Sequence, residues 1–170
     1  MPEIALGTKI FNRVTKLESL FDSLSDTPID TVYVADDGEP SEDKKKLYGA
    51  NYEFDLNVLD MEYDAGLGHG RNQIVEACDE PYLLIVDSDH QASPGIARLA
   101  KQLEARPKLG GVSGLLLERQ KIRGVCHDLF QKMNVLIRDV REDKIVQRVA
   151  GDPLIEFDFI PNTCMFRREA

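Results

Sequence analysis

Short apolar runs alternate along the chain with segments whose apolar positions recur at helical spacing. The apolar runs predict strands at residues 3–7, 30–35, within 52–61, 82–87 and 110–117. The periodic segments predict helices that begin after Asn12 and that cover residues 41–49, 71–79 and 93–105. Strands that alternate with helices in this way predict an α/β fold with a mostly parallel sheet and helices on both of its faces.

Residues that favour helix ends support these boundaries. Asn12 and Ser41 are predicted N-caps, and Gly49 is predicted to end the second helix. Ser93 followed by Pro94 predicts an N-cap and a first helical position for the fourth helix. The boundaries therefore follow from backbone hydrogen bonding as well as from the apolar pattern.

The pattern changes at about residue 118, where helical periodicity becomes weak. Three further apolar segments, NVLIRDV, KIVQRVA and LIEFDFI, predict strands separated by charged turns. We expect these strands to form an antiparallel or mixed addition to the sheet.

Composition and charge narrow the class of protein. A length of 170 residues with 42% hydrophobic residues is typical of one domain with its own core. No run approaches the roughly 18 apolar residues of a membrane span, and the N-terminus lacks a secretory signal pattern. We therefore expect a cytoplasmic protein that reaches a membrane only through a partner or a segment outside this chain. A net charge of −9 argues against nucleic acid as a partner.

Cysteine and histidine spacing supports no metal or redox motif of its own. The three cysteines, Cys78, Cys126 and Cys164, form no C-x-x-C and are expected to be reduced core residues. His69 and His127 share no ligand spacing with His90, which alone lies beside a cluster of acids. The segment GLGHGR is G-x-G-x-G, not the G-x-G-x-x-G of dinucleotide-binding folds, and an acidic segment precedes it.

Polar residues gather directly after the first four predicted strands. If these strands are parallel, their carboxyl ends meet at one edge of the sheet, which is where open α/β sheets bind ligands. The pattern therefore predicts one ligand-binding region at the carboxyl ends of the parallel strands, which we call the binding edge. The residues concerned are Thr8, Lys9, Asp36, Asp37, Arg71, Asp87 and Asp89.

Asp87 and Asp89 form a D-x-D at the end of the apolar run 82–86. Residues two apart on an extended chain point to the same side, so the two carboxylates can converge. A divalent cation such as Mg²⁺ would relieve their repulsion, and it is commonly held by one or two carboxylates plus phosphate oxygens. The alternative is that one Asp caps a turn or helix while the other is solvated.

The order and spacing of these segments resemble the family 2 glycosyltransferases, which have the nucleotide-diphospho-sugar-binding GT-A fold. The matching segments are IALGTKIFNRVTKLESLFDSL, VYVADDGEPSED, GHGRNQIVEACDEPYLLIVDSDH and FIPNTCMFRREA. The resemblance implies a three-layer α/β/α sandwich with a mostly parallel or mixed central sheet. It implies a single domain over residues 1–170, with a nucleotide-sugar-binding half at 1–117 and the start of an acceptor-side half at 118–170.

The resemblance also implies where the nucleotide would bind. Asp37 would accept a hydrogen bond from the base, with Asp36 as its neighbour, and the alternative is an Asx-turn that holds the loop. The segment with Thr8, Lys9 and Phe11 would lie along the base and ribose, although Phe11 has an alternative place in the core.

The resemblance likewise implies which residues would contact the diphosphate of the donor. Arg71 would meet the diphosphate or the base edge from a helix N-terminus, and its alternative is a salt bridge with a nearby acid. Asp89 is the implied metal ligand, and Asp87 would share the metal or hold the ribose. The cofactor implied is Mg²⁺ or Mn²⁺, and the donor is a UDP- or GDP-sugar.

The reaction implied is transfer of a sugar to a hydroxyl of a glycan, lipid or small molecule, with inversion of the anomeric centre. The family takes its general base from a segment after F-x-R-R-E, and this sequence ends at FRREA, so we expect an incomplete enzyme with no assigned base. One alternative is a non-catalytic nucleotide-sugar-binding or regulatory domain. A sugar nucleotidyltransferase is disfavoured because LGTKIFNR lacks a Gly-rich first loop.

Overall fold

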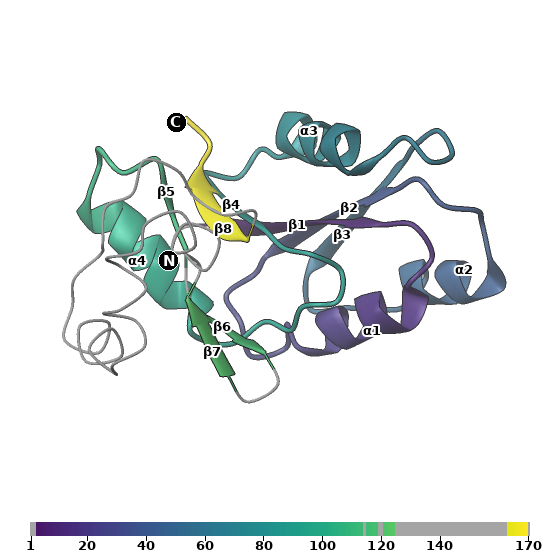
Figure 1. The fold of residues 1–170 in the computed structure, drawn as a ribbon, viewed down its shortest axis with the longest axis horizontal. Coiled ribbons are helices and arrows are strands. Elements are labelled where there is room, and N and C mark those ends of the chain that lie inside the picture. Colours follow the sequence, from purple (N-terminus) through teal and green to yellow (C-terminus); the bar gives the residue numbers. More distant parts are fainter. Residues whose placement is uncertain (1–2, 114, 119–120, 125–162, 170) are drawn as a thin grey trace. The chain divides into compact units, whose positions relative to one another are not determined.

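The computed structural model describes residues 3–113, 115–118, 121–124 and 163–169 (Figure 1). The chain divides into two compact units, residues 1–112 with 162–170 and residues 113–161. The first unit holds a six-stranded sheet, and the described part of the second holds a two-stranded one. The predicted strands at 134–140, 144–150 and 154–160 lie outside the described residues.

Strands and helices alternate through the first unit, as the apolar pattern predicts. Its elements are β1 (Ile4–Ile10), α1 (Val14–Asp22), β2 (Thr31–Asp36), α2 (Glu42–Tyr48), β3 (Asp55–Asp60), α3 (Leu67–Ala77), β4 (Tyr82–Ile85), α4 (Ile96–Ala105), β5 (Gly111–Val112) and β8 (Cys164–Arg167). The second unit has a hairpin-like pair, β6 (Leu115–Glu118) and β7 (Lys121–Gly124), which are antiparallel.

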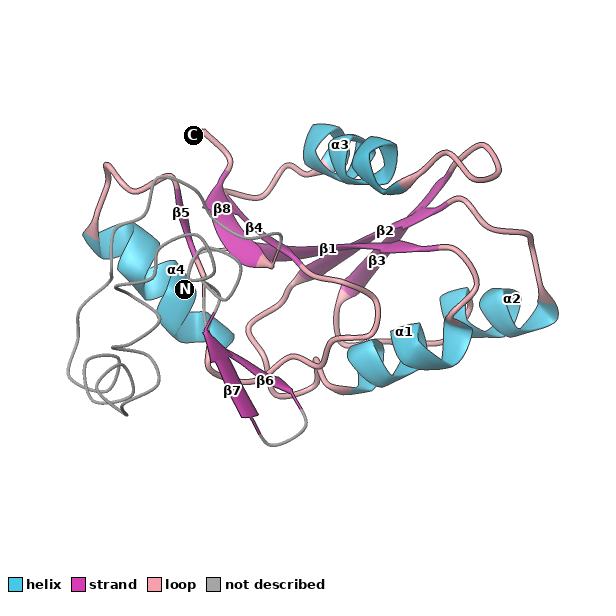
Figure 2. Ribbon diagram, viewed as in Figure 1, coloured by secondary structure: helices cyan, strands magenta, loops and turns pink. Residues whose placement is uncertain are grey.

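The central sheet is mixed, with the strand order β3-β2-β1-β4-β8-β5. Strands β3, β2, β1 and β4 are parallel, and β8 lies antiparallel between β4 and β5. Helix α3 covers one face of β1 and β2, while α1 and α2 lie on the opposite face (Figure 2). The predicted three-layer α/β/α architecture with a mixed sheet is therefore confirmed.

The core lies along the three inner parallel strands. Every residue of β2 and β4 is buried, and so is all of β1 except Lys9. Strands buried on both faces need continuous apolar runs, which is how these segments read in the sequence. The side of the sheet under α3 is packed by Ala5, Tyr33, Ala35, Ile74, Cys78, Leu83 and Ile85. Cys78 and Cys164 are buried free thiols, as predicted, and Cys126 lies outside the described residues.

Several predicted boundaries are confirmed and others are wrong. Ser41 caps α2 by accepting a hydrogen bond from the Lys44 N–H at 3.2 Å, and Gly49 ends that helix. Asn12 is not the N-cap of α1, because Arg13 occupies that position and no side chain caps the helix. Helix α4 begins at Ile96 rather than at Ser93, since a turn across Pro94 and Gly95 precedes it.

Two strand predictions are wrong in ways that affect the binding edge. Strand β1 continues to Ile10, so Thr8 and Lys9 lie within the strand rather than in the following loop. The predicted strand at 110–117 is two short strands, because β5 pairs with β8 while β6 pairs with β7. Strand β8 itself was not predicted.

Helix α3 begins at Leu67, four residues before the predicted start at 71. The segment GLGHGR is therefore mostly helical, and Gly66 immediately before it has a φ of +90°. A left-handed backbone at this point suits glycine, which has no Cβ to clash. Among the described residues, no helix has the length and apolarity needed to cross a membrane.

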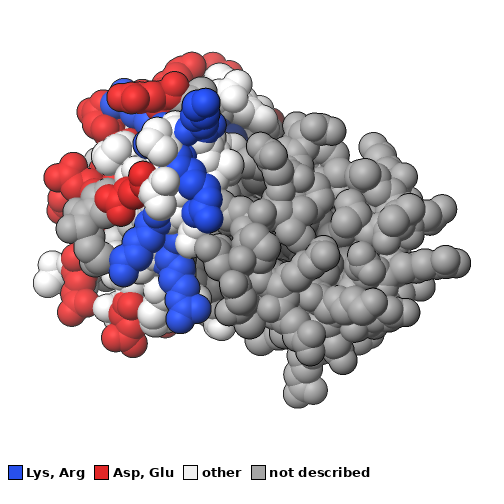
Figure 3. Space-filling view, turned by 90° about the vertical axis from the view of Figure 1, so that its left-hand side faces the viewer, with Lys and Arg blue, Asp and Glu red and all other residues white. Residues whose placement is uncertain are grey.

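One face of the described part of the chain carries charges of both signs. Figure 3 shows the side on which α4 lies, where Lys and Arg side chains form a row with Asp and Glu side chains along one side of it. Interspersed charges of both signs are ordinary for a solvated surface.

Candidate functional site

The polar residues singled out in the sequence meet at one edge of the sheet. Strands β2, β1 and β4 are parallel, and the register places Ile10 beside Asp36 and Gly7 beside Ile85. The segments that follow these strands therefore leave the sheet on the same side. Two clusters form there, one around Asp87 and Asp89 and the other around Asp37.

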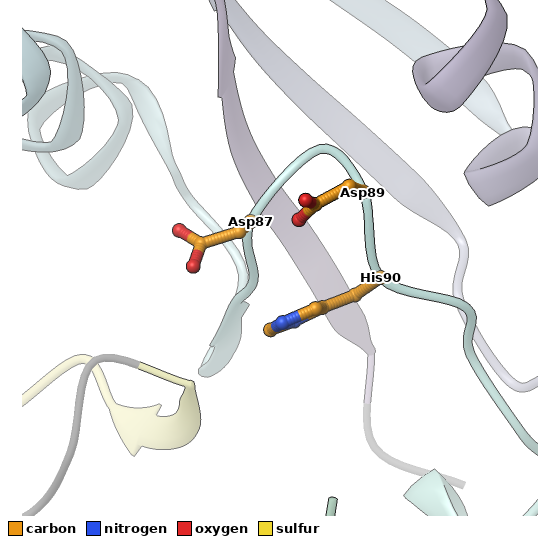
Figure 4. Close-up of side chains that lie close together, drawn as sticks. All are labelled: Asp87, Asp89 and His90. Carbon is orange, nitrogen blue, oxygen red and sulfur yellow. The ribbon is translucent and has the colours of Figure 1, made fainter. Parts of the chain in front are cut away.

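The first cluster consists of Asp87, Asp89 and His90 in the loop after β4. One carboxylate oxygen from each acid and one imidazole nitrogen of His90 lie within 4.8 Å of one another. Figure 4 shows the Asp89 and His90 side chains pointing from one arm of the loop toward the arm that carries Asp87, whose own carboxylate points outward from the loop. The His90 N–H donates to the Asp87 carbonyl at 3.0 Å, and this turn holds the two ends of the cluster together.

This cluster fits a divalent cation. Two exposed carboxylates supply oxygen ligands, and imidazole is a common additional ligand for first-row metals. The His90 Nδ1 atom is buried and has no hydrogen-bond partner among the described residues. A buried ring nitrogen without a partner is unusual in a folded protein, and a metal ion would satisfy it.

Two arginines approach the same carboxylates. The Arg71 Nη2 atom of α3 lies 2.9 Å from an oxygen of Asp87, and the Arg13 Nη1 atom lies 3.1 Å from an oxygen of Asp89. Each negative charge therefore has its own guanidinium, which explains how the two acids stay close together. The salt bridge given as the alternative for Arg71 is therefore present. The prediction that Arg71 lies at a helix N-terminus is wrong, because α3 begins at Leu67 and Arg71 is its fifth residue.

The second cluster is built around Asp37, whose side chain is fully buried. Lys9 Nζ lies 2.5 Å from one carboxylate oxygen, and the Gly66 N–H donates to the other at 2.9 Å. Burial alone would raise the pKa of Asp37, but the hydrogen bonds from Lys9 and Gly66 outweigh it and hold the pKa below its usual value. The Asp37 carboxylate is thus fixed in place by its contacts with Lys9 and Gly66. Lys9 is the more exposed member of the ion pair.

The shape of the second cluster depends on a close approach between α3 and β1. A Cβ atom on Gly70 would lie 2.8 Å from Lys9 Cγ, so only glycine lets the helix rest on the lysine side chain. The Lys9 ammonium lies 5.4 Å from the centroid of the Phe11 ring, a cation–π distance. Phe11 in turn contacts Tyr63, with 5.4 Å between ring centroids, and Tyr63 is 65% exposed.

Asp36 has different surroundings from its neighbour. One of its oxygens accepts from Lys44 Nζ at 2.6 Å and from the Gly38 N–H at 3.0 Å. The other accepts from the Tyr48 hydroxyl at 2.7 Å, and burial together with this acidic partner raises the pKa of Tyr48. Lys44 also donates to the Phe11 carbonyl at 2.8 Å, so Asp36 and Lys44 join α2 to the ends of β1 and β2.

The structure thus places the predicted residues in three settings. Asp87, Asp89 and Arg71 meet in the first cluster, Lys9 and Asp37 form the second with Phe11 beside them, and Asp36 belongs to the α2 contact. Thr8 is buried in β1, and its hydroxyl has no partner among the described residues. Sequence reasoning missed Arg13, Lys44 and Tyr63, since nothing in their local sequence marks them.

Comparison with known proteins identifies one matching family and solved structures of similar fold. A model described as Glycosyl transferase family 2 matches residues 7–170. A mannosyltransferase, PcManGT from Pyrobaculum calidifontis, solved with GDP-Man and Mn²⁺, has a TM-score of 0.66 at 17% identity, over 99% of this chain and 45% of that one. TarS 1–349 from S. aureus has a TM-score of 0.59 at 16% identity, over 98% of this chain and 47% of that one.

No curated protein matches the chain. The chain spans less than half the length of each of the two solved structures, and at such low identities the likeness is one of fold. The family match rests on sequence and extends over nearly all of the chain. The chain therefore belongs to glycosyl transferase family 2.

Proposed function

We propose that this chain forms the donor-binding part of an enzyme that transfers a sugar from a UDP- or GDP-sugar to an acceptor hydroxyl. The observation that carries the proposal is the convergence of Asp87, Asp89 and His90 with Arg71 where the parallel strands end. Residues 1–117 would bind the nucleotide sugar, and residues 118–170 would begin the acceptor side. The acceptor would be a glycan, a lipid or a small molecule.

The D-x-D cluster would hold the diphosphate through a divalent cation, Mg²⁺ or Mn²⁺. Asp89 and Asp87 would be its carboxylate ligands, with His90 beside them. Such a cation, when bound, neutralises charge on the diphosphate and on the departing nucleoside diphosphate. The Arg71 guanidinium would donate to phosphate oxygens from the same side. The solved neighbour that contains GDP-Man and Mn²⁺ supports a donor and a cation of these classes.

The Asp37 cluster would receive the base and ribose. Lys9 can donate to a base carbonyl, while Asp37 holds the ammonium in place and offers its carboxylate to a ring N–H. Phe11 and the exposed Tyr63 supply aromatic surface beside them. The buried Thr8 would support this surface from within β1. Asp36 would position the loop, because its contacts go to Lys44, Tyr48 and Gly38.

In the proposed reaction the acceptor oxygen attacks the anomeric carbon from the face opposite the leaving group. The bond from that carbon to the β-phosphate oxygen breaks, and its electron pair leaves with the nucleoside diphosphate. The acceptor proton passes to a general base, which is commonly a carboxylate in such a displacement. The configuration of the anomeric carbon is inverted.

The proposal is tested by titrating the chain with UDP and with GDP, each in the presence and absence of Mn²⁺. Isothermal titration calorimetry should show nucleotide binding that depends on Mn²⁺, and the Asp89→Asn variant should lose that dependence. Asp26→Asn is the matched control, because it removes another exposed carboxylate from a turn outside the site. Absence of binding by either nucleotide with Mn²⁺ would contradict the proposal.

A further inference from the structure

Arg13 lies two residues after Phe11, within the matched segment IALGTKIFNRVTKLESLFDSL, and no binding role is predicted for it from the sequence. It lies at the junction between β1 and α1, in the N-cap position of the helix. Its guanidinium reaches Asp89, which is 76 residues further along the chain. This ion pair therefore connects the first βα junction with the D-x-D loop.

The Arg13–Asp89 pair is easily broken. The Arg13 side chain is 66% exposed and that of Asp89 is 42% exposed, so water competes for both charges. Exposed ion pairs contribute little to stability and are screened by salt. Arg71 and Asp87 form a pair of the same kind, but the Arg71 side chain is only 20% exposed. Water therefore competes more strongly for the Arg13 guanidinium than for that of Arg71.

Occupation of the cluster would change the partner of Arg13. A divalent cation that shares the Asp89 carboxylate repels the guanidinium and weakens its attraction to that acid. A diphosphate bound at the same cation would place several anionic oxygens close by. The planar fork of a guanidinium matches phosphate oxygens in a two-point contact, which is stronger than its contact with one carboxylate oxygen.

We propose that Arg13 is a donor-binding residue that exchanges partners, from Asp89 in the free protein to the diphosphate of the nucleotide in the complex. This inference rests on the proposed function, because it needs the cation and the diphosphate at the D-x-D. In the free protein Arg13 competes with the cation for Asp89. In the complex it contributes to nucleotide affinity.

The two roles predict opposite effects of one substitution. With Mn²⁺ alone, Arg13→Gln removes a competing cation, so Mn²⁺ affinity rises by up to about fivefold, the equivalent of an exposed ion pair. With Mn²⁺ present, Arg13→Gln removes charge-assisted hydrogen bonds to phosphate, so affinity for UDP or GDP falls by roughly tenfold or more. A purely structural role of Arg13 would not move the two affinities in opposite directions.

The test measures both affinities on the full chain. Free Mn²⁺ is followed by electron paramagnetic resonance, and UDP and GDP binding by calorimetry at saturating Mn²⁺. Lys16→Gln is the matched control, because Lys16 is an exposed cation one turn further along α1. Arg13→Lys should keep part of the nucleotide affinity, since it retains the charge without the fork.

Three outcomes are informative. Tighter Mn²⁺ binding with weaker nucleotide binding in Arg13→Gln, and neither change in Lys16→Gln, supports the exchange. Equal nucleotide affinities for Arg13→Gln and Lys16→Gln, with Mn²⁺-dependent binding intact in the wild type, would overturn the inference and leave the proposed function standing. Absence of Mn²⁺-dependent binding in the wild type would overturn both.

Discussion

Replacement of Lys44 by methionine tests how the binding edge is held together. Lys44 is a buried cation: its side chain is 5% exposed, and that of its partner Asp36 is 9% exposed. The ammonium lies 2.6 Å from Asp36 and also donates to the Phe11 carbonyl at 2.8 Å. Methionine fills a similar volume but leaves the Asp36 charge without its cation.

The expected cost follows from what Asp36 retains. Removing one partner of a buried ion pair costs about 3–5 kcal/mol, because the remaining charge is left in a poorly solvated place. Asp36 keeps two other donors, the Tyr48 hydroxyl and the Gly38 N–H, which compensate part of this loss. We therefore expect Lys44→Met to lower the free energy of unfolding by about 3 kcal/mol, the lower end of that range.

The assay is urea unfolding at pH 7 followed by circular dichroism, because the chain has no tryptophan to report by fluorescence. Asp36→Asn introduced into Lys44→Met removes the unpaired carboxylate charge. It should therefore restore about 1 kcal/mol of the free energy of unfolding. Lys45→Met is the matched control: its pair with Glu42 is 68% and 77% exposed, and its loss should cost less than about 0.5 kcal/mol. Equal stabilities for Lys44→Met and Lys45→Met would refute the reasoning.

Two further outcomes follow from the second cluster. Because the pKa of folded Asp37 lies below the ordinary value of 3.8, its ionised form stabilises the fold above that pH and the contribution is lost as pH falls through the folded pKa. The stability difference between wild type and Asp37→Asn should therefore be constant near neutrality and shrink below about pH 4, and a difference that grows on acidification would contradict this. Gly70→Ala should destabilise by about 1–3 kcal/mol because its Cβ meets Lys9. Gly68→Ala, which meets no atom within 4 Å, should be neutral or stabilising by about 0.5 kcal/mol, and similar melting temperatures for the two would count against the packing described.

Local sequence predicts the parallel half of the sheet well. Strands β1, β2 and β4 are buried on both faces, so their apolar runs are continuous and easy to recognise. The polar edge was also predictable, because parallel strands place their carboxyl ends together. Ser41 was identified as a cap because its hydrogen bond is made within one turn of its own helix.

The parts that could not be predicted depend on contacts distant in sequence. The segment of β8 is four residues long and becomes a strand because β4 and β5 accept it on either side. Lys44 is one of three consecutive lysines, and only the fold shows which one turns inward. The start of α3 was placed too late because glycines disfavour helices, whereas Gly70 is needed where the helix meets Lys9.

The central claim is that the acids after β4 hold a divalent cation which in turn holds a diphosphate. Crystals of the chain grown with Mn²⁺ and UDP or GDP, measured for the anomalous signal of manganese, test it most directly. The account predicts a manganese peak in contact with the Asp89 carboxylate and with diphosphate oxygens of the nucleotide. A nucleotide bound elsewhere, or manganese bound away from Asp87 and Asp89, would contradict it.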